Sequence, residues 1–91
     1  MIHFSVEVEN RLGLHARAAA KLVQTASRFS SNIHLSRENA NQRIDSKSIL
    51  GILMLAAAKG TCLVFSIEGT DEQEAGEAIQ GLFQSKFGEK E

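Results

Sequence analysis

The sequence contains no proline, no tryptophan and no tyrosine, and it has one cysteine among its 91 residues. A single cysteine excludes an intramolecular disulfide. Because Cys62 lies in an apolar run, we expect a buried, inert thiol, which fits a reducing cytoplasm. The missing tryptophan and tyrosine are side chains on which nucleic-acid bases stack, so a base-stacking platform is not expected.

Excess charge and long apolar runs are also missing. Eleven acidic and ten basic residues give a formal net charge of −1, without a block of like charge, so a nucleic-acid partner is not expected. No stretch approaches the roughly 18 apolar residues of a membrane span. The first residues lack a basic segment followed by an apolar run, which a secretory signal requires. We expect one soluble, unexported domain over residues 1–91.

Hydrophobic periodicity predicts the first two elements. Apolar and polar residues alternate from Ile2 to Val8, which is the period of a half-buried strand. Residues 10–13 supply turn chemistry. From about Ala16 to Phe29 the apolar positions recur at helical spacing. The sequence therefore predicts a strand, a turn and an amphipathic helix in that order.

Three more strands follow from the same reasoning. Short alternating segments at 33–35 and 42–44 flank a polar turn and predict a hairpin, with His34 on its solvent face. A fourth strand is predicted between Thr61 and Ile67. Its core face carries Leu63, Phe65 and Ile67.

Two further helices complete the chain. Ser48 can cap a helix over 49–57, which Lys59-Gly60 would end with a left-handed C-cap. Asp71 and Glu74 have capping-box spacing before the last helix. The apolar stripe of that helix consists of Ala75, Ala78, Ile79, Leu82 and Phe83. Residues 88–91 are predicted to form a frayed charged tail.

The element order predicts an α+β fold. Amphipathic helices that alternate with short strands pack best as one helical layer on one antiparallel sheet. We therefore expect an open-faced β-sandwich, in which three helices cover one face of a four-stranded antiparallel sheet (β-α-β-β-α-β-α).

His15 and Arg17 stand where the first strand gives way to the first helix. The first N–H groups of a helix have no intrahelical partner, and the helix dipole adds positive charge there, which favours an anion. A neutral imidazole, with an unperturbed pKa of about 6.5, can accept a phosphoryl group, and a guanidinium binds phosphoryl oxygens. This junction is a candidate phosphate site. On these residues alone, a structural or merely exposed histidine stays an alternative.

The middle helix is apolar on too many sides to be fully buried. Three of its residues can face the sheet together: Ile52, Leu55 and Ala56. Four others cannot all follow them inward: Ile49, Leu50, Leu53 and Met54. Exposed apolar clusters on small proteins mark partner surfaces, although a more deeply buried helix is the alternative. Ser48 is either a simple N-cap or a phosphorylation site beside this cluster.

Three segments together form a specific pattern. In chain order they are GLHARAAAKLVQTASRF, IDSKSILGILMLAAAKG and IEGTDEQEA. This pattern resembles the HPr family of phosphocarrier proteins of the phosphoenolpyruvate-dependent phosphotransferase system, over nearly the whole chain. The resemblance implies the same open-faced sandwich, a single HPr-like domain over residues 1–91, and a cytoplasmic phosphoryl carrier that is not an enzyme.

The resemblance also implies roles for individual residues. His15 would accept a phosphoryl group from phospho-Enzyme I, on the ring nitrogen nearer the backbone, and pass it to the IIA component of a sugar transporter. The helix start at Ala16, Arg17 and Ala18 would stabilise the phosphate, with no metal and no organic cofactor. Ser48 matches the serine that HPr kinase/phosphorylase modifies in some bacteria. Partner docking is implied for Ile49, Leu50 and Leu53.

Two positions depart from the family pattern. Ala18 stands where proline is usual, which adds an N–H donor and leaves the helix start less preorganised. Asp45 stands where asparagine is common, and an acidic group near Ser48 could hinder a kinase.

Three functional alternatives remain open on the sequence. The favoured one is the sugar-system phosphocarrier. A regulatory HPr paralogue, controlling transcription, nitrogen metabolism or a kinase, would need His15 as well. In a third class the sheet is a plain ligand- or RNA-binding platform, against which the missing basic patch and exposed aromatic residues count. The small domain and a transient relay favour a monomer.

Overall fold

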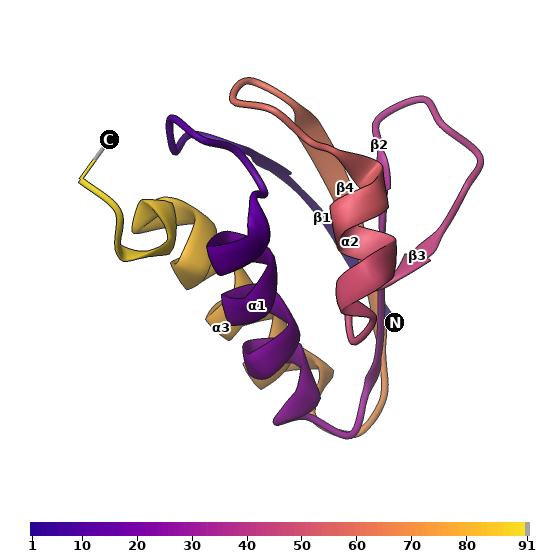
Figure 1. Cartoon of the computed structure of the whole chain (residues 1–91). Helices are drawn as coiled ribbons and strands as arrows, with labels where there is room; N and C mark the ends of the chain where they lie inside the picture. Colours follow the sequence, from indigo (N-terminus) through magenta and orange to yellow (C-terminus); the bar gives the residue numbers. More distant parts are fainter. Residues whose placement is uncertain (91) are drawn as a thin grey trace.

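The computed structural model describes residues 1–90, and the predicted fold class is confirmed (Figure 1). The four strands form one antiparallel sheet in the order β1-β4-β2-β3. No helix within residues 1–90 has the length and apolar character needed to cross a bilayer. The elements are β1 (Ile2–Glu7), α1 (Ala16–Ser27), β2 (Asn32–Arg37), β3 (Ile44–Asp45), α2 (Ile49–Leu55), β4 (Cys62–Glu68), α3 (Glu72–Gln84) and the 3₁₀ helix η1 (Lys86–Gly88).

The strands alternate between a covered face and an open face. On β4, the predicted core residues Leu63, Phe65 and Ile67 are buried, and the three helices pack over this side of the sheet (Figure 1). Cys62 lies at the start of β4 and is exposed, so the prediction of a buried thiol is wrong. The apolar run around it predicted burial, but a strand covered on one side exposes alternate residues.

The predicted hairpin is present as the β2–β3 pair. Its second strand is only two residues long and covers Ile44–Asp45, slightly later than the predicted 42–44. His34 pairs with Asp45 and is partly exposed, as expected for a residue on the open face.

Helix α2 begins as predicted but ends early. The Ser48 hydroxyl accepts a hydrogen bond from the N–H of Gly51 at 3.2 Å. The helix ends at Leu55, and Ala56 takes the left-handed conformation with φ +52, so the prediction that Lys59-Gly60 ends this helix is wrong. Ala56 is also exposed and does not face the sheet. The Arg37 guanidinium reaches across from β2 and caps the carbonyl of Leu55 at 2.7 Å, a contact that local sequence does not reveal.

The predicted capping box of the last helix is not formed. Asp71 is the N-cap residue of α3, but its side chain makes no cap hydrogen bond. Its carboxylate instead accepts from the backbone N–H groups of Ser30 and Ser31, at 2.9 and 3.0 Å, and from both hydroxyls. Asp71 therefore ties the start of α3 to the turn after α1.

The prediction of a frayed tail over 88–91 is wrong for Gly88, which belongs to η1, and for Glu89, whose carboxylate is bonded to Asn10 and His15; Glu91 lies outside the described residues. Phe87 is buried, and its ring meets that of Phe83 edge-on, with centroids 4.9 Å apart. Phe83 in turn meets Phe65 at 5.6 Å, and Phe65 stacks on Phe4 at 5.4 Å. This continuous aromatic row anchors the tail in the core.

Candidate functional site

A tight turn sets the direction in which the chain enters α1. Gly13 has φ +69, and a Cβ atom there would lie 2.5 Å from the carbonyl oxygen of Ala57. The N–H of Leu14 donates to that same oxygen at 2.9 Å. The turn is therefore held against the segment after α2, and His15 follows as the N-cap of α1.

The start of α1 offers donors to an anion. The first intrahelical bond runs from Ala19 N–H to the His15 carbonyl at 2.8 Å, and the Arg17 N–H donates to His15 Nδ1 at 3.3 Å. Within residues 1–90 the N–H groups of Ala16 and Ala18 have no hydrogen-bond partner. Ala16 and Arg17 are exposed, whereas Ala18 is fully buried. The accessible donors therefore come from the first two residues of the helix.

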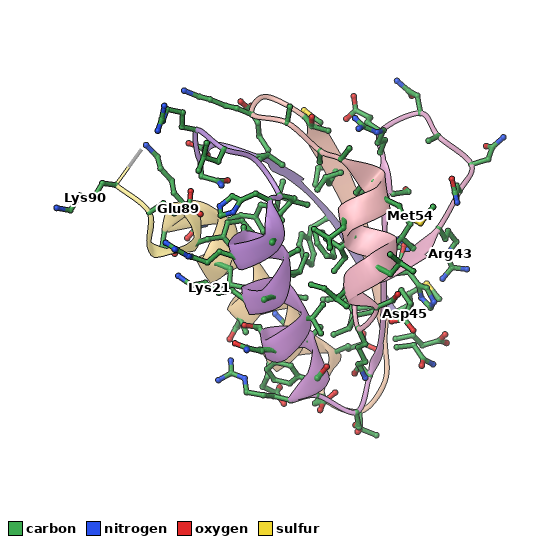
Figure 2. The ribbon with its side chains drawn as sticks, in the orientation of Figure 1. Lys21, Arg43, Asp45, Met54, Glu89 and Lys90 are labelled. Atoms are coloured by element: carbon green, nitrogen blue, oxygen red, sulfur yellow. The ribbon has the colours of Figure 1, made fainter. Side chains whose placement is uncertain are left out.

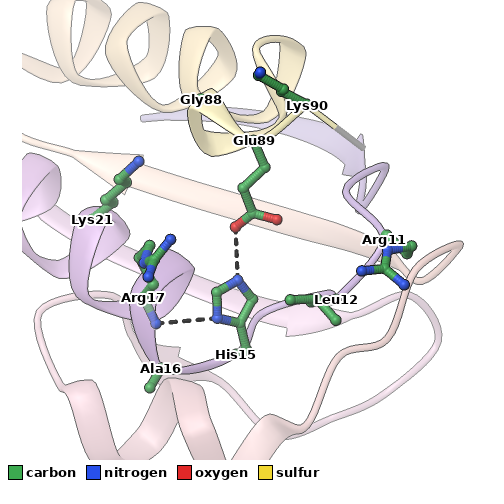
Figure 3. A pocket seen from close by; sticks show the side chains of 9 residues that line it. All are labelled: Arg11, Leu12, His15, Ala16, Arg17, Lys21, Gly88, Glu89 and Lys90. Carbon is green, nitrogen blue, oxygen red and sulfur yellow. Dashed lines mark hydrogen bonds and ion pairs between the residues drawn. The ribbon is translucent and has the colours of Figure 1, made fainter.

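His15 faces an open pocket of about 800 Å³ (Figure 3). Its side chain is 27 % exposed, so a partner can reach the ring. One lining side chain, Glu89, is a carboxylate, and four are cationic: Arg11, Arg17, Lys21 and Lys90. A surplus of cations around a nucleophilic imidazole suits a doubly charged phosphoryl group.

Two residues that contribute to the site, Asn10 and Glu89, were missed by sequence reasoning. The Nε2 atom of His15 lies 2.7 Å from Oε2 of Glu89, and Asn10 Nδ2 donates to Oε1 of Glu89 at 3.1 Å. Burial by itself would raise the pKa of the Glu89 carboxyl, but the hydrogen bonds from His15 and Asn10 outweigh it and the pKa lies below its usual value. Phe87, an apolar residue in an otherwise polar tail, was the one available signal that this segment docks.

The second candidate site lies on α2. Ser48 is the N-cap residue of α2, as the sequence predicted, and it is partly exposed. Helix α2 packs against α1, the helix whose N-cap is His15 (Figure 1). The exposed apolar cluster, called the α2 patch below, consists of Ile49 (41 % exposed), Leu50 (65 %), Leu53 (38 %) and Met54 (76 %). Figure 2 shows Met54 on the outer side of α2.

The described residues show no cluster suited to a metal. Within residues 1–90, no group of three or more histidine, cysteine, aspartate or glutamate side chains is placed to hold an ion.

Comparisons with known proteins identify the family of this chain. The family model described as "PTS HPr component phosphorylation site" matches residues 2–85. The phosphocarrier protein HPr of Neisseria meningitidis serogroup A is 46 % identical over 91 residues, covering all of both chains. A crystal structure of HPr from Thermoanaerobacter tengcongensis superimposes with a TM-score of 0.93 at 45 % identity, again over both whole chains. The HPr-like protein Crh of Halalkalibacterium halodurans is 42 % identical over 79 residues, which are 87 % of this chain and 92 % of that protein.

Proposed function

This chain belongs to the HPr family of phosphocarrier proteins of the phosphotransferase system, and we propose that His15 is the residue that carries its phosphoryl group. The phosphoryl group would come from phospho-Enzyme I and pass to IIA components. A family member is a carrier and not a catalyst, because it is itself phosphorylated in one transfer and dephosphorylated in the next. The observation that supports the proposal is the partly exposed imidazole at the N-cap of α1, with Nδ1 3.3 Å from the N–H of Arg17.

The chemistry needs only the groups at this junction. The Nδ1 lone pair forms the new N–P bond while the bond from phosphorus to the donor breaks, and its electron pair stays with the donor. The Arg17 guanidinium and the N–H groups of Ala16 and Arg17 hold the phosphoryl oxygens. The reverse sequence of bond changes delivers the group to a nucleophile on the next partner. No metal or organic cofactor takes part in this scheme.

Partner proteins would dock on the α2 patch. Its four exposed apolar side chains lie on the helix beside α1, so a partner that covers them can also reach His15. Phosphorylation of Ser48 by an HPr kinase/phosphorylase would add nearly two negative charges at the edge of the patch and weaken docking of an acidic partner. Asp45 lies close to Ser48, and its carboxylate accepts a hydrogen bond from the N–H of Lys47 at 2.9 Å. The negative charge of Asp45 would disfavour the kinase reaction.

The proposal is tested by phosphorylation in vitro. The protein is incubated with phosphoenolpyruvate and Enzyme I, and its intact mass is measured before and after acid treatment. We expect one acid-labile phosphate that is absent from His15→Ala. No phosphate on the wild-type chain, with an Enzyme I shown to be active on another carrier, would refute the proposal.

A separate reaction tests the regulatory site. With ATP and an HPr kinase, we expect an acid-stable phosphate that Ser48→Ala abolishes. Persistence of that phosphate in Ser48→Ala would place the modification elsewhere.

The regulatory paralogue has less support than the sugar-system carrier. The Crh-like protein of Halalkalibacterium halodurans matches a shorter part of the chain, at lower identity, than the HPr protein of Neisseria meningitidis does. We further propose a monomeric cytoplasmic protein that folds as one domain. One solved relative is described as an HPr dimer, so light scattering at micromolar concentration is the relevant measurement.

A further inference from the structure

The carboxylate of Glu89 is held in one orientation beside His15 (Figure 3). One oxygen lies 2.7 Å from His15 Nε2, and the other accepts from Asn10 Nδ2 at 3.1 Å. Asn10 is fully buried, and its amide also donates to the carbonyl of Gly13 at 2.7 Å. The amide group that orients Glu89 is thus itself fixed by the turn that precedes His15.

The backbone around Glu89 is equally constrained. Phe87 is buried in the aromatic row, and the ammonium group of Lys21 donates to the Phe87 carbonyl at 2.6 Å. The N–H of Glu89 donates to the carbonyl of Lys86 at 3.0 Å. The side chain of Glu89 is only 17 % exposed. The core and α1 therefore place this carboxylate at the imidazole.

The two contacts of the His15 ring require the same tautomer. Nδ1 accepts from the Arg17 N–H, so it must carry a lone pair. An ionised carboxylate only accepts, so the hydrogen on Nε2 must point to Glu89. The low pKa of Glu89 is consistent with an ionised group at neutral pH.

We infer that Glu89 is a positioning residue for the phosphoryl transfer: it holds the His15 imidazole with its proton on Nε2, so that the Nδ1 lone pair is available to the phosphoryl group. This inference rests on the proposed function of His15. The Arg17 N–H contact to Nδ1, at 3.3 Å, is long for a hydrogen bond. The incoming phosphorus takes the lone pair, and that N–H turns to a phosphoryl oxygen.

Glu89 also stabilises the charge that develops during transfer. When Nδ1 forms the N–P bond while Nε2 keeps its proton, the neutral ring becomes a positively charged phosphoryl-imidazolium. The Glu89 carboxylate lies on the side of the ring away from Nδ1, where it pairs with this charge without approaching the phosphoryl oxygens (Figure 3). When the N–P bond breaks, its electrons return to Nδ1 and the original tautomer is restored without a proton transfer.

The matched variant is Glu89→Gln, which keeps the size of the side chain. Glutamine has one oxygen for the two donors, His15 Nε2–H and Asn10 Nδ2–H, so its amide NH2 must face one of them. An NH2 group that faces His15 favours the opposite tautomer. The control is Glu77→Gln, an exposed position on α3.

The first measurement reads the tautomer directly, independently of Enzyme I. Two-bond ¹H–¹⁵N spectra at pH about 9, where imidazoles are neutral, report which ring nitrogen carries the proton. We expect His15 in the Nε2–H form in wild type and Glu77→Gln, and a mixture in Glu89→Gln. The signals of His3 and His34 are internal controls that should stay unchanged if the fold is intact. An unchanged His15 tautomer in Glu89→Gln would overturn the inference.

The second measurement is the single-turnover rate of phosphorylation by phospho-Enzyme I. We expect Glu89→Gln to be about tenfold slower than wild type, as for loss of a charge-assisted hydrogen bond to a developing charge, with Glu77→Gln unchanged. An equal rate would overturn the inference, and a faster one would show that Glu89 blocks the site. If the wild-type chain takes no phosphate, the proposed function and the inference are refuted together. If the wild-type chain is phosphorylated and Glu89→Gln reacts at the same rate, the inference alone is refuted.

Discussion

Gly13 and the carbonyl oxygen of Ala57 approach so closely that a Cβ atom on Gly13 would lie 2.5 Å from that oxygen. The turn before α1 thereby packs directly on the segment that follows α2. Together with the hydrogen bond from the Leu14 N–H to the same carbonyl, this contact fixes the position of His15 relative to the segment that follows α2.

Replacing Gly13 with alanine should therefore be costly. The residue has φ +69, and the added methyl group has backbone atoms rather than a flexible side chain against it. We expect Gly13→Ala to lower the free energy of unfolding by about 2 kcal/mol or more. Urea denaturation measures this change.

Gly81 provides a matched control, because it lies inside α3 and, among residues 1–90, a Cβ atom there would have no heavy atom within 4 Å apart from its chain neighbours and its own helix backbone. Gly81→Ala should raise the free energy of unfolding by about 0.5–1 kcal/mol. Equal effects of the two substitutions would contradict the close packing of Gly13.

Removing the ring of Phe87 should detach the tail. The side chain is 1 % exposed and packs edge-on against Phe83. We expect Phe87→Ala to cost about 3 kcal/mol of stability and to release Glu89 from His15. Thermal denaturation gives the first effect, and the ¹⁵N tautomer spectrum of His15 gives the second. Phe87→Leu should retain much of the stability and of the contact between Glu89 and His15. If Phe87→Ala were as stable as wild type, Phe87 would not be part of the core.

The hydrogen bonds that Asp71 accepts from Ser30 and Ser31 should make part of the protein's stability sensitive to acid. The Ser31 hydroxyl, followed by the Ser30 N–H, lowers the pKa of Asp71 from 3.8 to about 2. A carboxyl whose pKa is depressed by folding stabilises the native state above its unfolded pKa, and this contribution is lost as the pH falls toward the folded pKa. The loss should therefore occur between pH 4 and pH 2.

The substitution that tests the contribution of the Asp71 carboxylate is Asp71→Asn. We expect the variant to be less stable than wild type at neutral pH and to lose less stability between pH 4 and pH 2. Urea midpoints measured across that range provide the comparison, with Glu77→Gln as the control on the exposed side of α3. Parallel pH profiles for wild type and Asp71→Asn would show that the carboxylate contributes nothing.

Ser48 and Ser46 form a natural pair for measuring the cap of α2. The Ser48 hydroxyl accepts from Gly51 N–H, so Ser48→Ala should cost about 1 kcal/mol and Ser48→Asp should largely keep the cap. The Ser46 hydroxyl is buried and has no hydrogen-bond partner among residues 1–90, so Ser46→Ala should be neutral or slightly stabilising. Chemical denaturation ranks the variants; a loss in Ser46→Ala as large as that in Ser48→Ala would argue against the cap.

Local sequence patterns were sufficient to predict those features that depend only on residues within one helix or strand. The alternation of β1 and the helical spacing of α1 placed their junction correctly, and with it His15 at the helix start. Ser48 was identified as an N-cap because a cap bond spans only three residues. The surplus of apolar residues on α2 predicted exposed ones, and the structure shows four.

Contacts between distant segments were missed for one shared reason. Arg37 ends α2 from another strand, and Asp71 bonds to a turn 40 residues earlier instead of capping its own helix. Glu89 reaches His15 across 74 residues. Each is a polar side chain whose partner is chosen by the packed fold, and the partner is far away in the sequence.

By itself, the sequence determined the element order, the covered face of the sheet and the location of a histidine at a helix start, because periodicity and capping act within a few residues. Only the tertiary structure decided which groups surround that histidine. The aromatic row buries Phe87, and this burial brings Glu89 and Asn10 to the imidazole. Packing of the core, which joins residues from both ends of the chain, therefore determines the orientation of the ring and the tautomer that it presents.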